Sequence, residues 1–399
     1  MISASKMSPL KAAGTRLRTR LFGMLASLPL LGGALILPAP AVAASATRSV
    51  FGTLPDGRDV VAVTLRNRSG ISATVIAYGA TLQSVLLMAK NGHREEVTLG
   101  HNSLEPYLSN PQYFGATVGR FANRIAGGQF KLDGKSYQVP RNNGPNALHG
   151  GAVGFDKVLW EIVAVAQNPN RASAVLRYVS PDGDQRFPGK LTVTATYSLD
   201  EEDCLKVEYR ATTDRATVVN ISNHTYWNLA GDGSPRGAMG HLLTIPARTF
   251  LPVDATLTPT GEPRLVEGTA FDFRAPRIVG DRVREASNQQ IRYGRGYDHN
   301  WIVAEAVTKN LHLTARLSDP VSGRGVDIWS NQPGVQFYSG NFLDGTITGR
   351  TGRLYRQGDA IALEPQLFPD SVNHSAYPSA RLDAGREYVN NIEYRFFVK

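Results

Sequence analysis

Six short stretches of this 399-residue chain gather the side chains that could do chemistry. They place Asn, His, Asp, Gln, Glu and Arg in turn-like sequence among glycines and aromatic residues. These six polar stretches are residues 119–125, 146–151, 220–231, 297–300, 334–341 and 363–366. Aromatic faces cover the C–H side of a sugar ring, and planar polar groups pair with its hydroxyls. The residue types therefore indicate a sugar-binding site.

Other motifs do not point to chemistry. Residues 183–190 look like a phosphate loop, but five residues separate the glycines and a predicted strand follows in place of a helix. The eight histidines show neither H-x-H nor H-E-x-x-H spacing, so we expect no metal site. The single cysteine, Cys204, excludes an internal disulfide framework and is expected to be a small packing residue.

The elements that must position these residues are strands. Apolar residues occupy the odd positions of 191–199 and of 205–211, and an acidic turn at 200–203 separates the two runs, which predicts a β-hairpin. Asp133-Gly134 predicts a type I′ turn in a second hairpin. Further strands are predicted at 60–65, 81–87, 172–179, 311–317, 325–329 and 393–398.

No window of eleven or more residues has helical periodicity, and the 62 glycines and prolines suit many turns between short strands. We therefore expect an all-β fold, a large antiparallel sandwich or barrel. No repeat or linker follows residue 46, so residues 44–399 are expected to form a single domain.

The N-terminus is typical of a secretory signal peptide. Five basic residues and no acidic ones, an apolar run at 21–37 and an A-x-A pattern ending at Ala43 predict cleavage there, rather than a membrane anchor. Residues 1–43 are thus interpreted as a signal peptide of an exported, periplasmic or secreted protein, with no membrane association after cleavage. The remainder has 38 basic against 34 acidic residues, which argues against a nucleic-acid partner.

The polar stretches resemble those of the aldose 1-epimerase (galactose mutarotase) family, in family order and over nearly all of the mature chain. The matching segments are Gly119–Ile125, Leu148–Gly151, Asn223–Leu229, Tyr297–His299, Gln336–Phe342 and Glu364–Gln366. The resemblance implies a β-supersandwich that interconverts α and β anomers of free aldoses without a cofactor, with a monosaccharide as its partner. We expect a monomer or weak homodimer. One departure from the family pattern is Gln185-Arg186.

Mutarotation needs one base at the C1 hydroxyl and one acid at the ring oxygen. By resemblance, Glu364 is the base and His224 the acid, an imidazolium supported by a neighbouring acid. The resemblance assigns the sugar hydroxyls to five further residues: Asn123, Arg124, His149, Asp298 and Gln336.

Plainer interpretations compete with these roles. His224 could be a satisfied buried histidine, Asp298 an Asx-turn residue and Arg124 a structural ion-pair partner, and we expect His299 and His374 to be structural. If residues 120–124 form a strand, Arg120 and Arg124 share a face and make a small cationic patch. Two other functions stay open: an exported glycoside hydrolase or lyase, which would normally use two carboxylates, and a non-catalytic sugar-binding module.

Overall fold

The structure is a computed structural model that describes residues 44–109 and 112–399, so the predicted signal peptide lies outside the described residues. The described residues belong to one compact unit and fold almost wholly into antiparallel strands, as the sequence predicts. Two short α-helices occur in this part of the chain, α1 (Glu105–Ser109) and α2 (Gln289–Gly294). No helix within the described ranges is long and apolar enough to cross a membrane.

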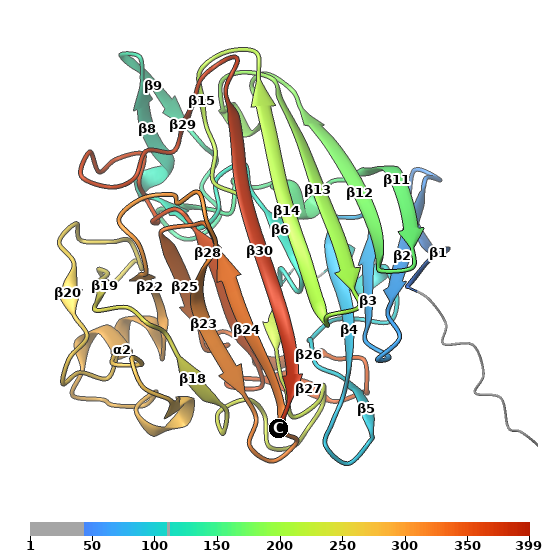
Figure 1. Cartoon of the computed structure of the whole chain (residues 1–399). Coiled ribbons are helices and arrows are strands. Elements are labelled where there is room, and N and C mark those ends of the chain that lie inside the picture. Colours follow the sequence, from blue (N-terminus) through green and yellow to red (C-terminus); the bar gives the residue numbers. More distant parts are fainter. Residues whose placement is uncertain (1–43, 110–111) are drawn as a thin grey trace, which may run out of the picture. The chain divides into compact units, whose positions relative to one another are not determined.

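One sheet of nine strands dominates the fold and crosses the view in Figure 1 from β11 to β18. Its strands, in spatial order, are β11 (Glu161–Asn168), β12 (Arg171–Ser180), β13 (Leu191–Asp200), β14 (Cys204–Thr213), β30 (Glu387–Val398), β24 (Arg324–Ser330), β23 (His312–Ser318), β18 (Leu242–Thr244) and β21 (Arg277–Ile278).

Two smaller sheets complete the layers. A five-stranded sheet contains β1 (Ser45–Thr53), β2 (Asp59–Arg66), β3 (Ser72–Ile76), β4 (Thr81–Met88) and β5 (Arg94–Glu96). A six-stranded sheet has the order β17 (Tyr226–Trp227), β28 (Ile361–Gln366), β25 (Gly334–Tyr338), β22 (Asp298–Ile302), β19 (Thr249–Leu251) and β20 (Arg264–Leu265).

Five further pairs of strands form small two-stranded sheets. They are β6 (Ala116–Val118) with β16 (Ser222–His224), β7 (Arg124–Ile125) with β10 (Ala147–Leu148), β8 (Gln129–Leu132) with β9 (Lys135–Gln138), β15 (Thr217–Val218) with β29 (Arg381–Leu382), and β26 (Asp344–Thr348) with β27 (Leu354–Arg356). Short 3-10 turns lie at Ala126–Gly128, Phe155–Lys157, Asp184–Arg186 and Val279–Asp281.

Both predicted hairpins are confirmed. Strands β13 and β14 pair along their whole length, and their apolar alternate positions are buried. The carboxylate of Asp200 accepts hydrogen bonds from the backbone N–H groups of Glu202 and Cys204, which fixes the acidic turn. In the β8–β9 hairpin, Asp133 and Gly134 have φ of 49° and 75°, as a type I′ turn requires.

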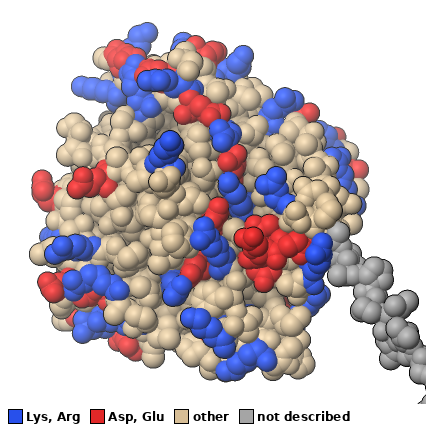
Figure 2. Space-filling model, in the orientation of Figure 1, with Lys and Arg blue, Asp and Glu red and all other residues tan. Residues whose placement is uncertain are grey.

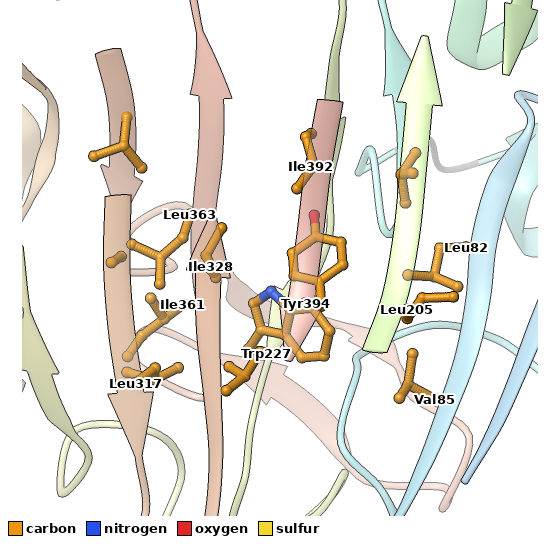
Figure 3. Packing of buried hydrophobic residues seen from close by; sticks show 14 of the residues in the cluster. Leu82, Val85, Leu205, Trp227, Leu317, Ile328, Ile361, Leu363, Ile392 and Tyr394 are labelled. Atoms are coloured by element: carbon orange, nitrogen blue, oxygen red, sulfur yellow. The ribbon is translucent and has the colours of Figure 1, made fainter. Parts of the chain in front are cut away.

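The core lies between the nine-stranded sheet and the two smaller sheets. One continuous buried cluster joins Leu82 of β4, Leu205 of β14 and Leu363 of β28. In Figure 3 Leu82 and Leu205 lie on the right and Leu363 on the left, with Trp227 and Tyr394 between them. At its centre the rings of Trp227 and Tyr394 lie 5.0 Å apart. Because one large sheet covers two smaller ones, the architecture is the expected β-supersandwich.

The surface carries both signs of charge. On the face shown in Figure 2, basic and acidic side chains are interspersed, and no continuous basic stripe crosses it. Exposed cross-strand ion pairs such as Arg316–Asp327 (2.5 Å) are part of this mixed pattern.

We predict that Leu205→Ala lowers the free energy of unfolding by about 2–5 kcal/mol, because Leu205 is fully buried between layers and its truncation leaves a cavity. Chemical denaturation measures this. Val163→Ala is the control, since Val163 is 40% exposed on β11 and its loss should cost about 0.5 kcal/mol or less. Equal effects of the two substitutions would contradict the layer packing described above.

Candidate active site

Neighbouring strands of the six-stranded sheet place polar side chains on one face. The register pairs Gln336 of β25 with both Asn300 of β22 and Glu364 of β28. Asp298 lies two residues before Asn300 and therefore faces the same way. The residues in between, such as Leu363, point into the core. Period-two alternation thus turns one side of an apolar sheet into a polar floor.

The short strand β16 brings His224 to this floor. Its Nε2 lies 3.6 Å from Oε1 of Glu364, and the two side chains are only 6% and 2% exposed. The hydroxyl of Ser222 donates to the carbonyl oxygen of Pro365 (2.8 Å), which ties β16 to β28. Glu364 is therefore a buried residue in the middle of β28 and not an exposed charge at a strand end.

A cavity of about 300 Å³ opens above this pair. Its volume is at the small end of the range for small-molecule pockets, which suits a single sugar ring. The cavity is lined by Gln112, Tyr113, Asn123, Arg124, Asn142, Asn143, Leu148, His149, His224, Tyr226, Asp298, Tyr338, Phe342 and Glu364.

Burial controls the protonation of the pair. It lowers the pKa of His224 to about 4 and raises the pKa of Glu364, which the charge of Asp298 raises further and that of Arg124 lowers. Burial thus opposes the imidazolium form of His224 that is expected from the sequence. Desolvation outweighs the attraction of a carboxyl group that lies beyond hydrogen-bond distance. Both shifts favour the uncharged forms, a neutral imidazole and a carboxylic acid.

His149 is held as a neutral donor. Its Nδ1 accepts a hydrogen bond from the backbone N–H of Asn123 (3.1 Å), so the neutral ring carries its proton on Nε2. Burial lowers the pKa of His149 well below 6.5, and a proton on His224 or the charges of Arg124 and Lys157 lower it further. The Nε2–H group can therefore donate to a sugar oxygen.

An ion pair fixes the cationic end of the site. Arg124 Nη2 lies 3.2 Å from Asp298 Oδ2, and the Gln336 amide donates to Asp298 Oδ1 (2.7 Å). Gln336 is buried behind Asp298 and is not among the residues that line the cavity. Its amide group orients Asp298, whereas Asn123, Arg124, His149 and Asp298 all reach the cavity.

The structure also brings together a group with the composition of a metal site. Ligand atoms of His149, His224 and Glu364 lie within 4.8 Å of one another. The three residues are so far apart in the sequence that no metal-binding motif could have revealed the group. A metal at Nε2 of His149 would require a proton on Nδ1, where the N–H of Asn123 already points. The tautomer of His149 thus disfavours a metal at this site.

Four aromatic residues that received no role from the sequence form the walls: Tyr113, Tyr226, Tyr338 and Phe342. The ring of His224 lies 4.9 Å from that of Tyr226, and Tyr113 contacts His149 edge-on at 4.7 Å. Three of the four lie within or directly after a polar stretch, and this position in the sequence could have identified them as site residues. Tyr113 lies before its nearest polar stretch, so no sequence pattern pointed to it.

Arg120 does not join Arg124 at the site, because residues 120–124 do not form one strand and β7 begins only at Arg124. Asn123 has φ of 65°, which breaks the strand alternation between the two arginines. The Arg120 guanidinium is buried and donates to the carbonyl oxygens of Pro188 and Gly189. Among the residues that line the cavity, Arg124 is the only Arg or Lys.

The remaining expectations concern residues outside the cavity. His299 is a buried structural residue, as predicted, and its Nδ1 accepts from the N–H of Asp298. His374 pairs with Asp370 at 3.3 Å, also away from the cavity. In the divergent loop, Gln185 accepts a hydrogen bond from the N–H of Val153 (3.1 Å), so this loop braces the segment that follows His149.

A cavity of this size, with the imidazole of His224 and the carboxyl group of Glu364 side by side on its floor, is suited to proton transfer on a single sugar ring. Fold and site together define a carbohydrate enzyme that works by acid–base catalysis. The chain belongs to the aldose 1-epimerase family, whose family model matches residues 61–395.

Known proteins resemble the chain over most of its length. It is 42% identical to the galactose mutarotase of Homo sapiens over 357 residues, 89% of this chain and 99% of the relative. It is 37% identical to the aldose 1-epimerase of Escherichia coli K12 over 347 residues, 86% and 97% of the two chains. The crystal structure of galactose 1-epimerase from Lactobacillus acidophilus superposes with a TM-score of 0.78 at 31% identity, covering 89% and 99%.

We predict that His149 stays neutral in the folded protein while the pH falls through the range in which a free histidine becomes protonated. Its pKa in the folded state lies below the unfolded value of about 6.5. The folded protein must therefore be brought to a lower pH than the unfolded chain before His149 is protonated. Side-chain ¹⁵N spectra should show the Nε2–H tautomer between pH 7.5 and 5.5. The urea-unfolded chain is the control and should titrate near 6.5. A folded-state midpoint near 6.5 would contradict the buried tautomer.

Proposed function

We propose that this protein is a mutarotase that interconverts the α and β anomers of free aldohexoses such as glucose and galactose. The observation that carries this is the pairing of His224 with Glu364 at 3.6 Å on the floor of a cavity sized for one sugar ring. Membership of the aldose 1-epimerase family supports the same reaction.

Ring opening is the first step. The pair holds one proton, and sugar hydroxyls that donate to Glu364 favour its carboxylate, so the proton moves to His224. Glu364 then removes the proton from the C1 hydroxyl as the bond between C1 and the ring oxygen breaks. His224 protonates the departing ring oxygen, and the product is an open-chain aldehyde with a free hydroxyl.

Ring closure reverses the transfers on the other carbonyl face. Rotation about the C1–C2 bond turns the aldehyde, and His224 removes the proton from the attacking hydroxyl. Glu364 returns its proton to the carbonyl oxygen, which becomes the C1 hydroxyl of the other anomer. The pair holds one proton before and after the cycle, so the protein needs no external acid or base.

The surrounding residues hold the sugar while C1 rotates. Arg124, Asp298, Asn123 and the Nε2–H of His149 contact ring hydroxyls, and Gln336 acts by orienting Asp298. Aromatic walls cover the C–H faces of the ring. The cavity's single cation is already paired with Asp298, which supports an uncharged sugar over a sugar phosphate.

The alternative functions fit the site less well. A glycoside hydrolase would need a second free carboxyl group across the bond, but the carboxylate of Asp298 is occupied by Arg124 and Gln336. A binding module would not need a desolvated acid–base pair, which is costly to bury.

We also propose that residues 1–43 export the enzyme to the periplasm or medium, supported by their signal-peptide pattern, and that it is a monomer or weak homodimer. N-terminal sequencing of the mature chain and analytical ultracentrifugation test these two points.

Polarimetry tests the function directly. The protein should accelerate the optical-rotation change of freshly dissolved α-D-glucose and α-D-galactose, with no release of reducing sugar from glycosides. A sugar-binding module would leave the rate unchanged, and a hydrolase would act on the glycosides instead.

Substitution of the catalytic pair tests the assigned roles. His224→Asn and Glu364→Gln should each lower kcat by about 10² to 10⁴, because each removes one proton-transfer group. This corresponds to about 3–5 kcal/mol of activation free energy. Binding should change less, which calorimetry with galactose can measure. A kcat near that of the wild type in either folded variant would refute that role.

A further inference from the structure

The guanidinium of Arg124 is held by two partners. Its Nε donates to the amide oxygen of Asn143 (3.0 Å), and its Nη2 donates to Asp298 (3.2 Å). The two contacts use one edge of the planar group and therefore fix its orientation. Nη1 has no hydrogen-bond partner within the described residues. Asn143 lies in none of the six polar stretches, three residues before the second of them.

Asn143 sits on a turn that is rigidly attached to the active site. The backbone groups of Asn143 and Asn146 bond to each other in both directions (3.1 and 3.0 Å). The side chain of the preceding Asn142 donates to the carbonyl oxygens of Leu148 and Gly151, on either side of His149. The acceptor for Arg124 is thus placed by the same loop that carries His149.

Asn143 also has no evident structural task of its own. It is half-buried and lines the cavity, and its amide oxygen is used by Arg124. Its amide nitrogen makes no hydrogen bond to any described residue. A residue needed only for the turn would not require a side-chain oxygen aimed at a guanidinium in the cavity.

We propose that Asn143 is a positioning residue for sugar binding: it fixes Arg124 so that Nη1 faces a hydroxyl of the bound sugar. The proposal rests on the mutarotase function given above. Without Asn143, the guanidinium is held at one end only and can rotate about its contact with Asp298. Sugar affinity then falls, while His224 and Glu364, which Asn143 does not touch, keep their proton-transfer geometry.

A double-mutant cycle tests whether Asn143 acts through Arg124. Asn143→Ala should raise KM and the calorimetric Kd for galactose about tenfold, the scale of one hydrogen bond to a charged group, and change kcat by less than about twofold. Arg124→Lys removes the Nε donor, so adding Asn143→Ala to it should change Kd by less than about twofold. Additive effects, or an unchanged Kd in Asn143→Ala, would overturn the proposal.

Two further variants separate positioning from general damage. Asn143→Asp keeps an acceptor for Nε and should hold Kd within about threefold of wild type, whereas a loss as large as in Asn143→Ala would count against the proposal. Asn170→Ala is the matched control and should change nothing, because this exposed turn asparagine has no side-chain hydrogen bond within the described residues.

The Kd cycle also separates this inference from the proposed function. If the wild type binds galactose with the expected coupling but shows no mutarotation, only the proposed function fails. If mutarotation is present and the coupling is absent, only the role of Asn143 fails. A wild-type protein that binds no sugar would refute both.

Discussion

The site depends on placing an imidazole and a carboxyl group side by side where both are almost fully buried. Burial penalises the charged form of each group, so the pKa of His224 falls to about 4 and that of Glu364 rises. The two shifts reverse the usual order of proton affinities, because the carboxyl group now binds a proton more strongly than the imidazole. A reversible isomerisation needs one group that gives a proton and one that takes it, and the pair supplies both.

Such a pair needs a rigid frame, because two desolvated polar groups would otherwise draw in water or move apart. Asn390 of β30 provides part of this frame from the large sheet. Its buried amide donates to the carbonyl oxygens of both Ile221 and Pro365, one close to His224 and one adjacent to Glu364. The hydroxyl of Ser222 binds the same Pro365 oxygen. The nine-stranded sheet therefore does more than bury apolar surface, since it locks the two strands that carry the acid and the base.

The neighbouring ion pair of Arg124 and Asp298 acts on the pKa of Glu364 in two opposite directions. Asp298 raises the pKa of Glu364 and Arg124 lowers it, so their fields oppose each other at the base. The positive charge of Arg124 in the pocket is thus partly offset at Glu364 by the negative charge of Asp298. Pairing within the pocket also leaves no free positive charge for a phosphate.

The sequence by itself determined the local strand structure and the candidate residues of the site. Period-two alternation predicted β13 and β14, Asp133-Gly134 predicted a tight turn, and the polar stretches contain His224, Glu364 and Asp298. Only the tertiary structure decided how these residues meet: that Gln336 stands behind Asp298, that Arg120 turns away from the cavity, and that Asn143 holds Arg124. Alternation is a property of the extended backbone and can be read within a few residues. Strand register and side-chain partners across the site come from packing between segments far apart in the chain, which no local pattern encodes.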